Sequence, residues 1–166
     1  MCLISDIINL MNKLLSRTEY EEMVKKIPNG DCRLCNLKDQ IMLGNSKYWF
    51  WIACLSPYWK YHTMLISKKH IEDIAELTAE EFTDLQNFYQ KIKNHLLSLK
   101  IKHSDDKPID QFMLMVRLRE ENIPGGSVYP KPKHLHIHFI PDREGAERFN
   151  LDSTAINIDI KSIALK

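Results

Sequence analysis

Hydrophobic residues recur at helical spacing in three stretches of the chain. The first runs from Ile7 to Leu15, the second from Met23 to Ile27, and the third and longest from Phe82 to Leu99. Apolar side chains three or four residues apart lie on one face of an α-helix. Each stretch therefore predicts a helix that buries one stripe of side chains against a core.

Two of these helices have a recognisable start. Thr18 with Glu21 has capping-box spacing ahead of the second helix, and Thr78 with Glu81 forms the same box ahead of the third. In such a box the hydroxyl and the carboxylate bind backbone N–H groups that the first helical turn leaves unpaired. Pro28-Asn29-Gly30 is expected to end the second helix.

Shorter apolar or alternating segments predict β-strands between and after the helices. These segments are Lys47–Leu55, Tyr61–Ser67, Gln111–Leu118, His134–Ile140 and Thr154–Ile160. The first two flank a turn at Pro57 and are expected to pair as a hairpin. A long insert, 119–133, separates the next two.

This order of elements predicts an α+β fold with an antiparallel sheet and one long helix. A length of 166 residues suits one compact domain. We expect residues 1–30 to form an N-terminal helical extension, residues 31–150 the main domain, and residues 151–166 a C-terminal tail strand.

Composition and charge narrow the class of protein. A formal net charge of +1 does not predict an extended nucleic-acid surface. No apolar run approaches the roughly 20 residues that span a bilayer, so no membrane association is expected. The N-terminus lacks the basic start and the small-residue end of a secretory signal. Four cysteines, two of them in a Cys-x-x-Cys, fit a reducing compartment, and we expect a cytoplasmic location.

The strand His134–Ile140 carries the strongest chemical signal. Alternate side chains of a strand share a face, so three histidines line one side while Leu135, Ile137 and Phe139 point into a core. Each imidazole has a polar edge that needs a partner, so packing alone explains three of them poorly. Histidine titrates near neutral pH and can attack phosphorus or move protons. The alternatives are an exposed histidine-rich strand and a metal site built on one His-x-His pair.

Other aromatic and histidine residues match no motif. His95 and His103 are expected on the surface. The run Tyr48–Trp51 is expected to pack in the core, with the alternative that one of its faces borders a nucleoside pocket.

The alternating histidines resemble the His-φ-His-φ-His-φ-φ signature (φ, apolar) of the histidine triad (HIT) superfamily. Pro57, His62 and the stretch Met64–His70 are similar to that family's Pro-x-x-x-Gly-His-x-Leu-Val-Ile-Pro-Lys-x-His segment. The helix that starts after Thr78 follows in the same order. The resemblance therefore implies an HIT-like antiparallel sheet with a long helix.

This resemblance covers roughly Cys32 to Arg143 and implies a role for each histidine. His136, the middle one, would be the nucleophile and would form a nucleotidyl-histidine intermediate, which splits one displacement into two. His138 would contact the phosphate or the leaving-group oxygen. His62 would support the cluster by hydrogen bonding. The substrate would be a nucleotide attacked at its α-phosphate.

Cys32-x-x-Cys35 is a candidate metal site, because two thiolates at this spacing can bind one ion. By spacing alone, a reactive or an incidental cysteine pair is an equal alternative. The chain also resembles the zinc-bearing branch of the family, in which two histidines complete the site. Those positions are His70 and His134 here. The resemblance thus implies a structural zinc that ties the N-terminal segment to the strand of His136.

Substrate recognition departs from the family pattern in two places. Cys54 stands where many members carry an acid that binds the ribose, so it is a candidate substrate-binding residue with altered ribose recognition. Ser127, in a Gly-Gly-Ser-Val segment, resembles the phosphate loop but lies farther from the triad. A third departure, Ser67 in place of proline, is expected to matter little.

Positive charge near the phosphate is expected from Lys131, Lys133 and Arg143, with ordinary solvated charge as the alternative. These features favour a nucleotidyl hydrolase acting on a phosphoramidate, a dinucleoside polyphosphate or a nucleotidylated adduct. The alternatives are a nucleotidyltransferase, a weakly active nucleotide-binding module and a metallohydrolase. The resemblance also implies a two-fold homodimer, the commonest assembly of soluble proteins. The apolar face of the first helix could instead cover that surface in a monomer.

Overall fold

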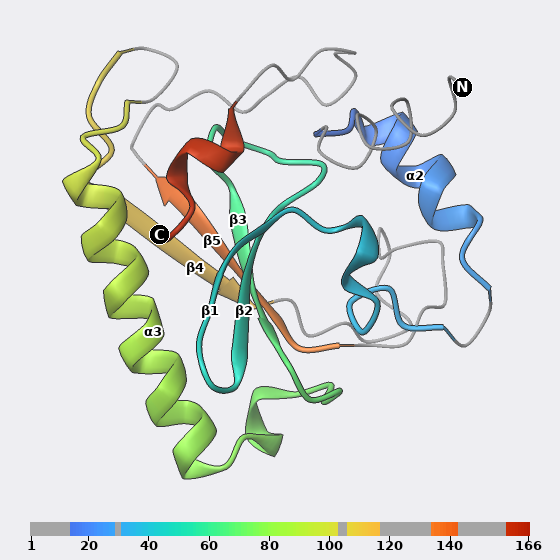
Figure 1. The fold of residues 1–166 in the computed structure, drawn as a ribbon. Coiled ribbons are helices and arrows are strands. Elements are labelled where there is room, and N and C mark those ends of the chain that lie inside the picture. Colours follow the sequence, from blue (N-terminus) through green and yellow to red (C-terminus); the bar gives the residue numbers. More distant parts are fainter. Residues whose placement is uncertain (1–13, 29–30, 103–105, 117–133, 143–158) are drawn as a thin grey trace.

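The computed structural model describes residues 14–28, 31–102, 106–116, 134–142 and 159–166 (Figure 1). Five strands form one sheet in the order β1-β2-β3-β5-β4, with every neighbouring pair antiparallel. Their bounds are β1 Met42–Asn45, β2 Trp49–Ala53, β3 Thr63–Ser67, β4 Gln111–Val116 and β5 His136–Asp142. The α-helices are α2 Arg17–Lys25 and α3 Ala79–Ser98, and short 3-10 helices span Leu37–Asp39, Ile74–Glu76 and Ile160–Ile163. The expected α+β fold with an antiparallel sheet and a long helix is confirmed.

The strand register separates a core face from a site face. Directly opposed residues of antiparallel strands share a face. Ile137 pairs with Leu65, and both side chains are buried in the main core with those of α3. His136 and His138 pair with Ile66 and Met64, so these side chains lie on the opposite face. The predicted alternation of β5 is therefore confirmed.

The long helix α3 packs along the core face of the sheet, with α2 on the other side of the molecule in the view of Figure 1. Phe88, Ile92 and Leu96 are buried in the core, as predicted. The two ends of the predicted stripe differ, since Phe82 is 52% and Leu99 is 38% exposed. Phe82 lies one position beside the buried stripe, which starts at Glu81, and Leu99 is the C-cap residue of the helix.

Aromatic side chains fill the core between α3 and the sheet. Trp49 and Trp51 are fully buried, which confirms core packing for most of the aromatic run. The indole N–H of Trp49 donates to the Glu81 carbonyl at 3.0 Å, and that of Trp51 donates to the Thr63 hydroxyl at 2.8 Å. Phe50 is half-buried and packs on the site face instead.

The capping box of helix α2 lies two residues earlier in the chain than predicted. The box of α2 is Ser16 with Glu19, both bonds being present, rather than Thr18 with Glu21. Leu15 precedes it in non-helical backbone and donates its N–H to the Leu55 carbonyl at 2.6 Å. This bond fixes the entry of the chain, so the hydroxyl available at the helix start is that of Ser16. The first predicted helix lies outside the described residues except for Leu14 and Leu15, which are not helical.

Two further differences concern the edge of the sheet and the tail. The sequence pattern predicts no strand over Met42–Asn45, which forms β1. The predicted tail strand lies mostly outside the described residues, and its last residue, Ile160, begins a 3-10 helix instead. Beyond it, the Leu165 N–H donates to the Leu43 carbonyl at 2.7 Å, so the C-terminal residues cover β1. Among the described helices, none is long and apolar enough to cross a membrane.

Candidate functional site

A tight turn between β2 and β3 carries the first histidine of the site. His62 follows Tyr61, whose φ of 60° lies in the left-handed region. The family pattern has glycine at this position, and glycine adopts that region without strain. Tyr61 is half-buried against the main core, and this packing holds the turn in place. His62 is thereby fully buried at the edge of the site face.

Hydrogen bonds set the proton positions on two of the histidines. The Tyr58 backbone N–H donates to His62 Nδ1 at 3.1 Å. Neutral His62 therefore carries its proton on Nε2, which lies 2.9 Å from His138 Nδ1 and donates to it. Since His138 Nδ1 is an acceptor, neutral His138 carries its proton on Nε2. The backbone of Tyr58 thus determines, through His62, that His138 is an N–H donor at Nε2.

The middle histidine has the opposite proton position. His136 Nδ1 lies 2.7 Å from the His134 carbonyl, to which it donates. Neutral His136 therefore carries its proton on Nδ1 and not on Nε2. Its ring lies 5.1 Å from that of His138, nearly perpendicular to it. An unprotonated ring nitrogen of His136 and an N–H donor of His138 thus belong to neighbouring rings on β5.

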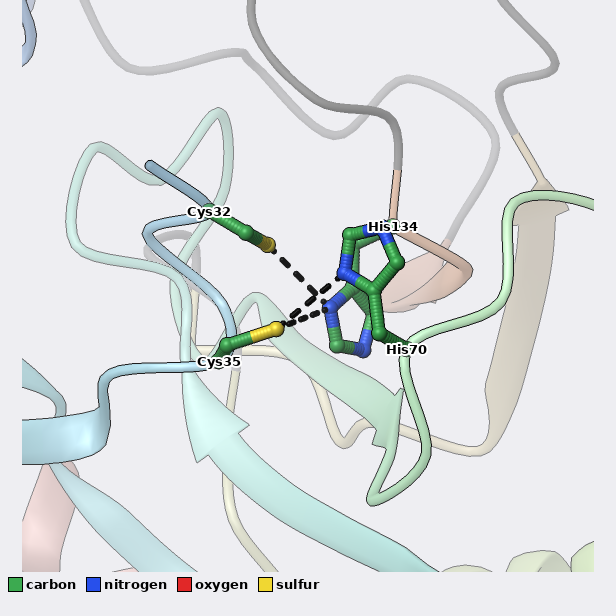
Figure 2. A group of neighbouring side chains, drawn as sticks. All are labelled: Cys32, Cys35, His70 and His134. Carbon is green, nitrogen blue, oxygen red and sulfur yellow. Dashed lines mark hydrogen bonds between the residues drawn. The ribbon is translucent and has the colours of Figure 1, made fainter. Parts of the chain in front are cut away.

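Two cysteines and two histidines from distant parts of the chain form a second group (Figure 2). The Cys35 sulfur lies 3.1 Å from His70 Nδ1 and 3.4 Å from His134 Nδ1, and the Cys32 sulfur lies 3.3 Å from His134 Nδ1. The four candidate ligand atoms are all within 4.8 Å of one another. The structure therefore brings together all four residues that the resemblance implied as metal ligands.

The environment of this group suits a cation. The Ser67 carbonyl accepts from His134 Nε2 at 2.8 Å, so the lone pair of Nδ1 faces the sulfurs. Burial, reinforced by His70 and His136, lowers the pKa of His134 below 6.5, which favours the neutral ring that a metal requires. Although Cys35 is exposed as a whole residue, desolvation of its thiol and the adjacent Cys32 raise the pKa of that thiol to about 11. A bound cation would release these thiol protons.

Cys54, His62 and His138 form another close Cys/His group, but its hydrogen bonds differ. A metal-bound histidine nitrogen usually has an N–H on the opposite side of the ring that donates to an acceptor. His134 has that arrangement with the Ser67 carbonyl, whereas His62 accepts a backbone N–H there. The Cys54 thiol donates to the Ser56 carbonyl at 3.4 Å and is 8% exposed. This group therefore fits proton positioning better than metal binding.

The remaining predicted residues are placed as follows. Cys54 lies next to His62 and His138, and ribose recognition by it stays a prediction. Ser127, Lys131, Lys133 and Arg143 lie outside the described residues. His95, expected on the surface, is half-buried, and its Nε2 donates to the Ile163 carbonyl at 3.0 Å. Its bond to Ile163 connects α3 with the C-terminal 3-10 helix, and its ring lies edge-on to Trp51 in the core.

Sequence reasoning missed two contributors to the site. The role of Tyr58 is carried by its backbone N–H, which leaves no signal in residue identity. Ser67 was expected to be a minor replacement, yet both its carbonyl and its hydroxyl contact His134. A polar residue at the end of an otherwise apolar strand, three residues before His70, was the available signal.

Solved structures show the same fold. A hypothetical histidine triad nucleotide-binding protein from Sulfolobus tokodaii strain 7 aligns with a TM-score of 0.53 at 18% identity, covering 80% of this chain and 88% of that one. A HIT-like protein involved in cell-cycle regulation from Bartonella henselae gives 0.51 at 17%, covering 88% and 89%. A uridylyltransferase mutant gives 0.51 at 19%, covering 74% of this chain and 37% of the other. No curated protein matches the chain significantly.

The antiparallel sheet, with His134 directly before β5 and His136 and His138 alternating on it, defines a protein of the histidine triad type. The model of the HIT domain family matches residues 37–145. The chain belongs to the HIT domain family.

Proposed function

We propose that this protein is a nucleotidyl hydrolase that cleaves its substrate at the α-phosphate through a covalent intermediate on His136. The observation that carries the proposal is the pair of opposite proton positions on β5. His136 presents an unprotonated Nε2, held by the His134 carbonyl, next to the Nε2–H of His138. A nucleophile with an adjacent hydrogen-bond donor is what displacement at a phosphate requires.

The chemistry follows from these atoms. His136 Nε2 attacks the α-phosphorus, a P–N bond forms, and the leaving group departs with the electron pair of the broken bond. The Nε2–H of His138 hydrogen-bonds a phosphate or leaving-group oxygen as its negative charge grows. A water then attacks the phosphorus, the P–N electron pair returns to His136, and the proton of the water passes to solvent. Throughout, the His134 carbonyl stabilises the positive charge on the His136 ring.

We propose a structural zinc ion held by Cys32, Cys35, His70 and His134. Two thiols and two imidazoles match the preference of zinc for four Cys and His ligands in structural sites. The lone pair of His134 Nδ1, directed at the sulfurs by the Ser67 carbonyl, supports this assignment. The ion would hold the turn of Cys32–Cys35 against the segment that enters β5. Because the His134 carbonyl also accepts from His136, a fixed His134 positions the nucleophile.

Transfer to an acceptor other than water is the second candidate. Its support is the shared fold with a uridylyltransferase, the activity in that protein's name. Both candidates use the same intermediate on His136 and differ only in what attacks it. A product assay with and without a sugar phosphate separates them, because transfer yields a sugar nucleotide and hydrolysis yields a nucleoside monophosphate.

The test is turnover of the His136→Ala variant. Wild-type protein is assayed with a nucleoside phosphoramidate, a dinucleoside polyphosphate and a sugar nucleotide, and the best substrate is retained. We expect His136→Ala to lower kcat by about 10³-fold or more, since removing a nucleophile costs several orders of magnitude. Nucleotide affinity, measured by calorimetry, should change little.

The matched control is His103→Ala, which removes a histidine that belongs to no motif and should leave kcat at the wild-type value. Retention of most activity by His136→Ala, with a substrate that the wild type turns over, would contradict the covalent mechanism. Full inactivity of the wild type on all three substrates, together with nucleotide binding, would favour the nucleotide-binding module instead.

A further inference from the structure

Ser67 is the last residue of β3, and its side chain is close to His134 and to the turn that leads to His70. It is 4% exposed. Its carbonyl accepts from His134 Nε2 at 2.8 Å, and its hydroxyl oxygen lies 3.2 Å from the same nitrogen. The hydroxyl donates to the Lys69 carbonyl at 2.7 Å. One side chain thus connects His134 with the residue before His70.

These bonds orient the His134 ring directly and act on His70 through the backbone of the preceding residue. The two Ser67 oxygens hold His134 Nε2–H, which leaves Nδ1 facing the cysteine sulfurs. The bond to the Lys69 carbonyl braces the turn that leads to His70, whose Nδ1 faces Cys35 at 3.1 Å. Ligands already held in their bound direction lose less conformational freedom on binding, so the affinity of the site is higher.

Proline, the residue of the family pattern here, could supply only part of this support. It has a carbonyl for His134 but no hydroxyl, so it cannot reach the Lys69 carbonyl. It also has no N–H, and the Ser67 N–H donates weakly to the Leu135 carbonyl at 3.4 Å. Serine therefore adds contacts to His134 and to the His70 turn that proline lacks.

We infer that Ser67 is a positioning residue of the metal site, whose hydroxyl raises metal affinity by orienting His134 and the turn of His70. This inference rests on the proposed four-ligand site. The proposed role of Ser67 is therefore separate from metal ligation by the cysteines and from the reaction proposed for the histidine triad.

The test measures cobalt(II) affinity of the full chain by competition with a chromophoric chelator, with the thiolate-to-cobalt absorption as a second signal. Ser67→Ala should bind cobalt about 10-fold more weakly, or worse, the usual cost of losing a second-layer hydrogen bond. Ser67→Thr, which keeps the hydroxyl, should restore most of the affinity. Ser98→Ala is the matched control, because it removes a hydroxyl that donates to a backbone carbonyl on α3.

The outcomes separate this inference from the proposed site. If the wild type binds cobalt, Cys32→Ser does not, and Ser67→Ala binds as tightly as the wild type, the role of Ser67 is wrong while the site stands. An equal loss in Ser67→Thr and Ser67→Ala would also overturn it. Absence of thiolate-to-cobalt absorption in the wild type would overturn the site itself.

Discussion

At the scale of single residues, the neighbours of each histidine decide which nitrogen carries the proton. A backbone N–H makes His62 a donor to His138, whereas a backbone carbonyl leaves His136 unprotonated at Nε2 and another directs His134 Nδ1 toward the cysteine sulfurs. The four rings are chemically identical, yet their hydrogen bonds do not place the proton on the same nitrogen in each. The sequence shows that histidines alternate, but it cannot show which backbone group each ring meets.

The thiol of Cys32 gives a residue-scale prediction. Cys32→Ser should lower the bound zinc from near one ion per chain to a small fraction, measured by elemental analysis of protein purified without chelators. It should also lower the melting temperature, because binding energy in a closed site contributes to folding. At this chain length each kcal/mol lost corresponds to roughly 2–4 °C.

Cys54→Ser is the control for this variant, since it removes a buried thiol from the other Cys/His group. It should keep its zinc. Equal zinc content in Cys32→Ser and wild type, or a metal-free and fully stable wild type, would refute the assignment.

The sequence predicts the residues of the metal site better than it predicts their proximity in the fold. The spacing of Cys32 and Cys35 indicates a candidate metal site by itself, whereas His62, His70 and the ligand role of His134 are implied by the family resemblance. Their proximity could not be derived from spacing, because 102 positions separate Cys32 from His134. Folding of β3 next to β5 brings the two histidine segments together, and only the family resemblance anticipated that.

At the scale of elements, local hydrogen bonding specifies α3 well. The Thr78 hydroxyl accepts from the Glu81 N–H at 3.2 Å, and the Glu81 carboxylate accepts from the Thr78 N–H at 2.8 Å. This box was predicted from four residues because no competing hydroxyl lies nearby. For α2, Thr18 and Ser16 both had the required spacing to a glutamate, and the tertiary bond of Leu15 to Leu55 decided between them.

Strand β1 could not be predicted for a related reason. It has only four residues and contains Gly44 and Asn45, which are unfavourable in strands. Pairing with β2 stabilises it, and Gly44 leaves room for Leu165, whose Cδ1 would lie 2.9 Å from a Cβ at this position. The C-terminal residues that require this space are more than a hundred positions away, so no local pattern reveals the strand.

The capping box of α3 gives the element-scale prediction. Thr78→Ala should lower the free energy of unfolding by about 1 kcal/mol at pH 7, the usual cost of an N-cap. Hydrogen bonds from the backbone and side chain of Thr78 hold the pKa of Glu81 below 4.5. The stability from this ionised carboxylate is present above pH 4.5 and is lost as pH falls through the lowered pKa. The difference between variant and wild type should therefore shrink in acid.

Urea denaturation across pH measures this difference. Thr83→Ala is the control, because its hydroxyl bonds the Ala79 carbonyl within the exposed helix and is not part of the cap. It should be neutral or slightly stabilising. A Thr78→Ala deficit that stayed constant down to pH 3 would contradict the role of Glu81.

At the scale of the whole molecule, we predict a two-fold homodimer through the β4 side of the sheet. Leu114 on the edge strand β4 is 46% exposed, and Phe82 and Leu97 are exposed on α3. A dimer that pairs the two β4 edges and covers these apolar side chains would avoid the aggregation that an exposed edge strand invites. Light scattering should give twice the chain mass of 19.6 kDa at micromolar concentration.

Leu114→Lys should weaken this dimer and lower the measured mass on dilution. Met42→Lys places the same charge on the opposite edge strand, at a residue of similar exposure (39%), and should leave the mass unchanged. A mass of 19.6 kDa for the wild type at every concentration would show that the protein is a monomer.

Detection of the covalent intermediate tests the proposed mechanism most directly. The wild type is mixed with its best substrate, quenched within one turnover in alkali, where phosphoramidates survive, and digested for tandem mass spectrometry. We expect a nucleoside monophosphate on His136 of the wild type and none on the His136→Ala variant. Mild chelation that leaves zinc bound should not remove it. Modification of another residue, or rapid turnover with no labelled histidine at any quench time, would contradict the proposed mechanism.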